Sequence, residues 1–232
     1  MTIEQANQYF AALPDGFAST EQLRAAFTAP VQKVQFVGVA GTAGKTTVAA
    51  LLAATLRAAG IRAGLYHAGC EPLSVRVRVD GAPVDEGLLC LATEAQAAAE
   101  PLPQDAAELA AAAYAFGEAG CALAVVELPD AGLAEALPQM PVCAVTSVGP
   151  DGVSRSVERL AALAAGVMRK DSICVTAPEQ PKAVLSELIV AAGKCDCELV
   201  VPDPEDITFL EAEKFASKVD YGGYTVPLAF LG

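Results

Sequence analysis

The segment from residue 34 to residue 60 constrains the fold of this chain more than any other. It opens with Val34–Val39, a run of β-favouring residues of strand length, and continues with Gly41–Thr47, which reads Gly-Thr-Ala-Gly-Lys-Thr-Thr. Apolar residues then recur at helical spacing until Gly60, namely Val48, Leu51, Leu52 and Leu56. This order predicts a buried strand, a glycine-rich turn and a helix, which is the repeating unit of a parallel α/β sheet.

The same alternation of strand and helix continues along the chain. Further strands are predicted at 61–66, 122–127, 142–147, 172–176 and 198–201, and helices at 105–118, 154–169 and 181–192. We therefore expect an α/β fold with a doubly wound, mainly parallel sheet. A small β-hairpin is expected at 76–84, outside that sheet, because Arg76 and Arg78 alternate with valines and need water on one face. Residues 83–105 are expected to be rich in loops.

The charge balance limits the classes of partner. The 232 residues include 28 acidic and 15 basic side chains, a formal net charge of −13, which repels phosphate backbones and anionic lipids. We expect neither nucleic acid nor membrane as a partner. No signal segment is recognised, and the seven cysteines are scattered without a CxxC pair, as in reduced proteins. The expected location is cytoplasmic.

The glycine-rich turn predicts a phosphate-binding site within this acidic chain. Its residues are Gly41, Thr42, Ala43, Gly44, Lys45, Thr46 and Thr47. Backbone N–H groups at a helix start converge on an anion, while Lys45 can reach the β- and γ-phosphates of ATP and Thr46 can meet Mg²⁺. The spacing departs from the common G-x-x-x-x-G-K-[ST], because Val39 replaces the first glycine. A turn that merely joins strand to helix is the alternative.

With this departure, the segment from Val39 to Thr47 resembles the nucleotide loop of the Mur ligase superfamily. The likeness is greatest to the folylpolyglutamate synthases, whose loop reads A-G-T-N-G-K-[GST]-[ST]. Similar segments recur in order at 49–60, 63–66, 76–81, 123–127, 145–149 and 161–170. The likeness covers most of residues 1–200. It implies the central-domain fold of Mur ligases, so that 1–232 forms a single P-loop ATP-binding domain. The segment 1–30 would be helical and the segment 203–232 irregular.

The resemblance implies an ATP-dependent amide ligase that activates a folate-like or other carboxylic acid as an acyl phosphate. ATP and Mg²⁺ would be its cofactors. Lys45 and Glu127 would be catalytic, and Thr46 and Glu127 would bind the metal. Independently, Glu127 ends a predicted strand, and carboxyl ends of parallel strands face the ligand in such sheets. The alternative for Glu127 is a solvated acid at a strand end.

Several positions depart from the family pattern. Gly152 stands where a metal-binding histidine is expected, Ala164 where the family carries a carbamylated lysine, and the loop after Tyr66 lacks the family's serine. His67 in that loop could replace a lost ligand, although a lone loop histidine is more typical of a surface. Asp151 and Glu71 are further candidates. Relatives continue into an amino-acid-binding domain. That domain is expected to be absent here, and a partner protein is a candidate to supply it.

Three functions remain open at this stage. The first is an ATP-binding ligase domain that is weakly active or inactive alone. The second is a degenerate, non-catalytic nucleotide-binding partner module, and the third is a P-loop ATPase or kinase of another type. Loss of a single transition-state donor typically costs about a hundredfold in rate, and several family donors are missing together. We therefore expect low autonomous turnover.

Overall fold

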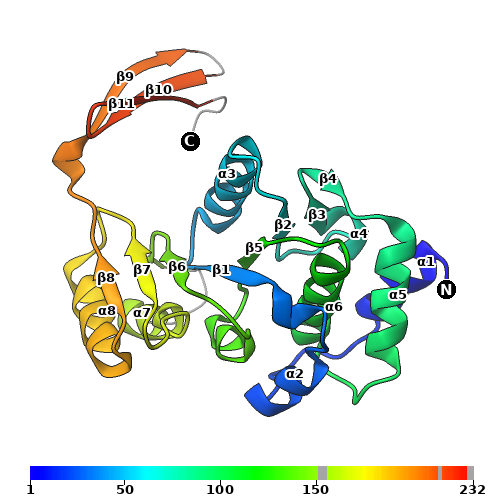
Figure 1. The fold of residues 1–232 in the computed structure, drawn as a ribbon. Helices are drawn as coiled ribbons and strands as arrows, with labels where there is room; N and C mark the ends of the chain where they lie inside the picture. Colours follow the sequence, from blue (N-terminus) through cyan, green and yellow to red (C-terminus); the bar gives the residue numbers. More distant parts are fainter. Residues whose placement is uncertain (151–155, 214–215, 229–232) are drawn as a thin grey trace.

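The fold is built on one large sheet, seen in a computed structural model that describes residues 1–150, 156–213 and 216–228. The strands lie in the order β4-β3-β2-β5-β1-β6-β7-β8 (Figure 1). Their bounds are Gln35–Ala40 (β1), Ala63–Tyr66 (β2), Val77–Val79 (β3), Ala82–Pro83 (β4), Leu123–Glu127 (β5), Val142–Val145 (β6), Ile173–Thr176 (β7) and Glu198–Val200 (β8). From β2 to β8 all neighbours pair in parallel. The predicted doubly wound, mainly parallel sheet is confirmed.

Helices cover both faces of this sheet. They are Ile3–Ala11 (α1), Thr20–Ala26 (α2), Lys45–Ala58 (α3), Leu73–Arg76 (α4), Glu86–Ala97 (α5), Gln104–Glu118 (α6), Val157–Ala165 (α7) and Lys182–Cys195 (α8), with short 3₁₀ turns at Val31–Lys33, Ala131–Ala136 and Pro204–Asp206. Alternate residues of a strand point to opposite faces. Accordingly, Val39, Leu65 and Val125 pack under α3, whereas Phe36 and Val126 belong to the larger core with α6, α7 and α8.

The alanine-rich helix α6 packs closely against the sheet. Ten of its fifteen residues are buried, most of them alanines. Where it passes β2, a Cβ on Gly64 would come within 2.5 Å of the ring of Phe116. Small side chains on both elements therefore allow this approach, and they fix the distance at which the sheet and its covering helices pack.

The β-hairpin exists, but our prediction that it lies outside the sheet is wrong. β3 pairs antiparallel with β2, so β3 and β4 form the edge of the main sheet. Arg76 does not belong to the hairpin: it ends the short helix α4, is only 3% exposed and pairs with Glu108 at 2.7 Å. The buried carboxylate offsets the cost of burying the guanidinium, which removes the need for a water-facing side.

Two segments expected to be loop-rich or irregular contain helix and strands among their described residues. Within 83–105, the helix α5 starts at a cap in which Asp85 accepts a hydrogen bond from the amide of Leu88. Within 203–232, the strands Ile207–Glu213 (β9), Ala216–Tyr221 (β10) and Tyr224–Leu228 (β11) form a separate antiparallel sheet. Gly222 and Gly223 have positive φ and make its tight turn, which is a hairpin signal that we did not use.

In the described part of the chain, helices are too short or too polar to cross a membrane. All seven cysteines are free thiols.

Candidate phosphate and metal site

The glycine-rich loop lies between β1 and α3, as predicted. Gly44 adopts a left-handed conformation with φ 82°, after which α3 begins at Lys45. The amides of Thr42 and Ala43 both donate to the carbonyl of Ser147, at 3.0 and 3.2 Å. These two amides are therefore occupied within the protein, and the amides that remain for an anion are those at the start of α3.

The first turn of α3 suits an anion because no side chain in the described part of the protein caps its backbone N–H groups. No side chain caps Gly44, and the first turn contains no acidic residue. By contrast, α1, α2, α5 and α7 begin at side-chain caps, from Thr2, Ser19, Asp85 and Ser156. The helix α8 also starts at a lysine without such a cap, so the preceding glycine loop is what distinguishes α3.

Replacing Gly41 with alanine should weaken phosphate binding. Gly41 has φ +133°, and a Cβ there would lie 2.2 Å from Oγ1 of Thr146, so the loop must shift. We expect affinity for ATP to fall about tenfold or more, the equivalent of one lost charge-assisted contact. Calorimetric titration of the G41A variant measures this. Gly149→Ala is the control, since a Cβ on Gly149 meets no described atom; equal losses in both variants would contradict the assignment.

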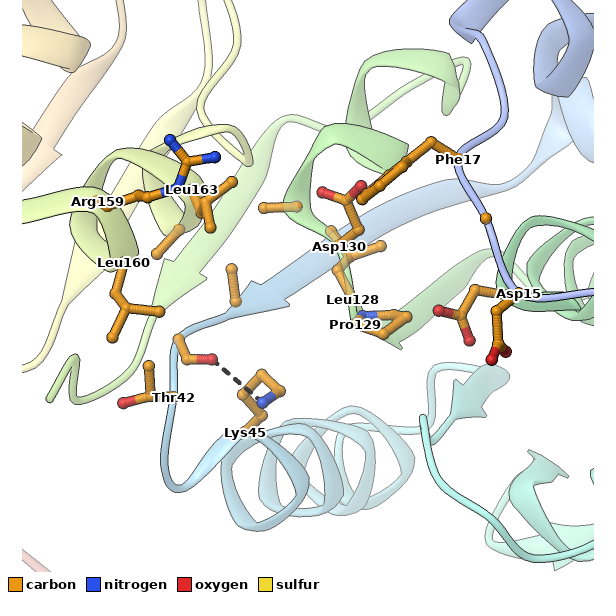
Figure 2. Close-up of a pocket in the computed structure, with 16 residues that line it drawn as sticks. Asp15, Phe17, Thr42, Lys45, Leu128, Pro129, Asp130, Arg159, Leu160 and Leu163 are labelled. Carbon is orange, nitrogen blue, oxygen red and sulfur yellow. Dashed lines mark hydrogen bonds between the residues drawn. The ribbon is translucent and has the colours of Figure 1, made fainter. Parts of the chain in front are cut away.

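Lys45 lies across the loop, where a bound phosphate would meet it. Its Nζ donates to the carbonyl of Gly41 at 3.1 Å, the dashed line in Figure 2. A main-chain carbonyl is a weak partner for an ammonium group, compared with an anionic phosphate oxygen. The contact therefore holds Lys45 near the helix start and leaves it free to exchange partners.

Glu127 and Thr46, which the resemblance places on a metal, are brought together. The register pairs Glu127 with Val39, so the carboxylate ends β5 beside the loop. Its oxygens accept hydrogen bonds from Oγ1 of Thr46 at 3.0 and 3.2 Å. Only 6% of the Glu127 side chain is exposed, so the interpretation as a solvated strand-end acid is wrong. A buried carboxylate without a lysine or arginine partner among the described ion pairs is a candidate ligand for a cation.

His67 is not the surface residue that we expected. Its side chain is 18% exposed, and its Nδ1 lies 3.6 Å from Oε2 of Glu127. Nδ1 is also buried without a hydrogen-bond partner among the described residues. The sequence offered no local signal for this position, because β2 and β5 are neighbours only in the folded sheet.

A cavity of about 750 Å³ opens beside the loop. Figure 2 shows Lys45 and Thr42 on one side, Arg159, Leu160 and Leu163 on a second, and Phe17, Asp130 and Asp15 opposite. Asp105 and Ala164 also line it. The cavity therefore has a cationic residue on each of two sides, Lys45 and Arg159, and an acidic wall formed by Asp15, Asp105 and Asp130.

The acidic wall is expected to cost stability at neutral pH. Partial burial, and next the charge of Glu108, raise the pKa of Asp105. The folded state thus binds more protons than the unfolded chain, so stability falls as pH rises from the usual aspartate pKa of 3.8 through the raised value. Asp105→Asn should therefore stabilise the protein at neutral pH but not near about pH 3, where both states are protonated. Urea unfolding at both pH values tests this; equal effects would contradict it.

The structure describes only some of the other positions at which the resemblance expects functional residues. Ala164, where the resemblance expects a lysine, lies in the cavity wall, so the position faces the site but offers no metal ligand. Asp151 and Gly152 lie outside the described residues. Among the residues that are described, no cluster of three histidine, cysteine or acidic side chains could hold a metal. A cation at Glu127 would thus depend on hydroxyl groups, phosphates and water as well.

Comparison with solved structures identifies the fold. A folylpolyglutamate synthetase from Lactobacillus casei superposes with a TM-score of 0.82 at 18% identity, over 100% of this chain and 62% of that one. The chain has the folylpolyglutamate synthase fold. The Mycobacterium tuberculosis folylpolyglutamate synthase, solved with ADP, gives 0.79 at 20% identity over 94% and 54%. Escherichia coli FolC, solved with DHPP and ADP, gives 0.77 at 19% identity over 97% and 57%.

The chain spans about three fifths of the length of these folylpolyglutamate synthases. No family model and no curated protein sequence matches it.

Proposed function

We propose that this chain binds ATP and Mg²⁺ at the loop 41–47 and forms the ATP-binding domain of an acid–amino acid ligase of folylpolyglutamate synthase type. The observation that carries the proposal is the Thr46–Glu127 pair beside an uncapped helix start. Hydroxyl and carboxylate oxygens are the ligands that Mg²⁺ takes in proteins, with water and phosphate completing its shell. The residues present therefore fit the ion, which would neutralise charge on the transferred phosphate.

The cavity beside the loop supports an activation step on a carboxylic acid. Lys45 and the amides opening α3 would hold the β- and γ-phosphates, and Arg159 would attract the carboxylate of the acid toward them. The carboxylate oxygen would then attack the γ-phosphorus, the bond to ADP would break, and an acyl phosphate would form. An incoming amine would displace phosphate from that acyl group to give the amide. The protein's part is placement and charge stabilisation.

A folate-like acid is the proposed acyl substrate. Support comes from neighbours: one folylpolyglutamate synthase structure with a TM-score of 0.83 holds AMPPCP and folate. The cavity here has matching chemistry, since a carboxylate could face Arg159 while N–H groups at the far end meet the aspartates. The amino-acid substrate would be bound by a further segment or by a partner protein. That segment or partner would correspond to the part of the neighbours that this chain does not span.

Ala164 favours a second candidate, a nucleotide-binding partner module without ligase activity. A lysine-derived ligand is missing from the wall that faces the site. Transfer of the phosphoryl group needs charge at the γ-phosphate, and one lost donor costs about a hundredfold or more in rate. Binding of ATP would survive this loss, because Lys45, Thr46 and Glu127 act on it independently of Ala164.

We therefore expect the 232-residue chain to show little or no ligase turnover with ATP, folate and glutamate, beside slow hydrolysis of ATP. Glutamate-dependent release of ADP measures turnover directly. Substantial glutamate-dependent release that vanishes in Glu127→Ala, but persists in Glu198→Ala, would contradict the expectation of low activity. Glu198 is a suitable control because it is an exposed glutamate at the start of β8.

A further inference from the structure

The strongest unassigned feature is His67, the chain's single histidine. Its Nδ1 lies 3.6 Å from Oε2 of Glu127, on the side of the carboxylate that Thr46 also reaches. That nitrogen is buried, and the described residues offer it no hydrogen-bond partner. Buried polar atoms almost always have a partner, so an orphan atom facing a carboxylate points to a missing bridging group.

The position of His67 is built into the fold. Its amide donates to the carbonyl of Arg76 at 3.1 Å, and its own carbonyl accepts from Nη1 of Arg76 at 3.2 Å. The same guanidinium is fixed by the buried Glu108 at 2.7 Å. Arg76 thus clamps the main chain at His67 twice, through its own carbonyl and through its ion-paired guanidinium. The imidazole of the clamped residue lies at the carboxyl end of β5, 3.6 Å from Glu127.

We propose that Nδ1 of His67 is a third protein ligand of the divalent cation held by Glu127 and Thr46. The inference rests on the proposed cation site and adds to it. Neighbouring ligands of one octahedral ion lie about 3 Å apart when each bond is about 2.1 Å. The atoms here are separated by 3.0 Å for Thr46 to Glu127 and 3.6 Å for His67 to Glu127, so a small inward shift would bring His67 to the ligand spacing relative to Glu127.

A nitrogen ligand changes which metal the site favours. Mg²⁺ prefers oxygen, whereas imidazole suits transition metals, and affinity rises along the first-row series from Mn²⁺. Mn²⁺ accepts both oxygen and nitrogen and still serves as a partner for phosphates. We therefore expect this chain to bind Mn²⁺ in preference to Mg²⁺ at the nucleotide site, and expect His67 to be the cause.

Pulsed electron paramagnetic resonance of bound Mn²⁺ tests the inference. The probe is Mn²⁺ with ATP, added to tag-free protein labelled with ¹⁵N in histidine alone, so that every labelled nitrogen belongs to His67. Mn²⁺ is chosen because the seven free thiols would compete for softer metals. The expected result is a ¹⁵N hyperfine coupling typical of direct coordination. It should disappear in Glu127→Gln and persist in Glu198→Gln, a change of an exposed acid at the start of β8.

Affinity measurements complete the test. His67→Ala should lower Mn²⁺ affinity about tenfold or more, the scale on which metal sites respond even to supporting residues, and should change Mg²⁺ affinity far less. Bound Mn²⁺ without ¹⁵N coupling, with affinity unchanged by His67→Ala, would overturn the inference and leave the proposed ATP site intact. No Mn²⁺ bound even with ATP would overturn both. The coupling is read from the unmodified sequence, so the result does not depend on a variant folding.

Discussion

Replacing Lys45 with alanine should weaken binding of ATP and Mg²⁺ about tenfold or more, because hydrogen bonds to charged groups contribute about 1.5–3 kcal/mol. The ammonium group lies over the loop and donates to the carbonyl of Gly41 at 3.1 Å, and Lys45 lines the cavity beside this loop. In a chain of net charge −13, a tetra-anionic ligand depends on such local attraction. Isothermal titration calorimetry measures the change.

The matched control for this change is Lys182→Ala. Lys182 also begins a helix that follows a strand of the main sheet, and α8 likewise has no side-chain cap. It lacks the glycine loop, so removing its charge should leave ATP affinity nearly unchanged. Comparable losses in the two variants would show that ATP responds to overall charge and would count against a site at the loop.

The second large effect should follow Glu108→Leu, which leaves a buried guanidinium without its counter-charge. Both side chains are nearly inaccessible, at 3% for Arg76 and 2% for Glu108, and they lie 2.7 Å apart. Glu108 also accepts hydrogen bonds from the hydroxyl of Tyr66 and from Gln104. Breaking a buried pair by removing one partner costs about 3–5 kcal/mol. Urea unfolding should show this loss in the free energy of unfolding.

Two further variants separate charge from packing in that result. The double variant Arg76→Met, Glu108→Leu removes both charges and should lose less stability than Glu108→Leu alone. Arg62→Ala breaks an exposed ion pair with Asp80 at 3.6 Å, and should cost at most about 1 kcal/mol. If Glu108→Leu proved no more costly than Arg62→Ala, the buried pair would not be the clamp described for the loop of His67.

Local periodicity predicted the parts of the fold in which each element carries its own signal. The unit β1–loop–α3 and the strands β5, β6 and β7 show apolar runs, glycines and helical spacing within short windows, and the structure places them as expected. The Thr46–Glu127 contact was also predictable, because parallel strands bring their carboxyl ends to one edge of the sheet.

Features that depend on distant partners were not predictable in this way. The alternation of Arg76 and Arg78 indicated a water-facing hairpin, but Arg76 is buried by Glu108, which lies 32 residues further on. His67 meets Glu127 only because β2 and β5 pair, so no local pattern distinguished it from a surface histidine. The helix α5 and the sheet β9–β11 did carry local signals, an aspartate cap and a double-glycine turn. The prediction of loop-rich or irregular segments did not use these signals.

The most direct test of the central claim is a binding isotherm of the unmodified chain with ATP in the presence of Mg²⁺. Equilibrium dialysis is the suitable method, because its result does not depend on a heat of binding. An ATP site at residues 41–47 predicts one saturable site that ADP competes for and that Lys45→Ala weakens about tenfold or more. Failure of the unmodified chain to retain ATP at any concentration of Mg²⁺ would contradict it.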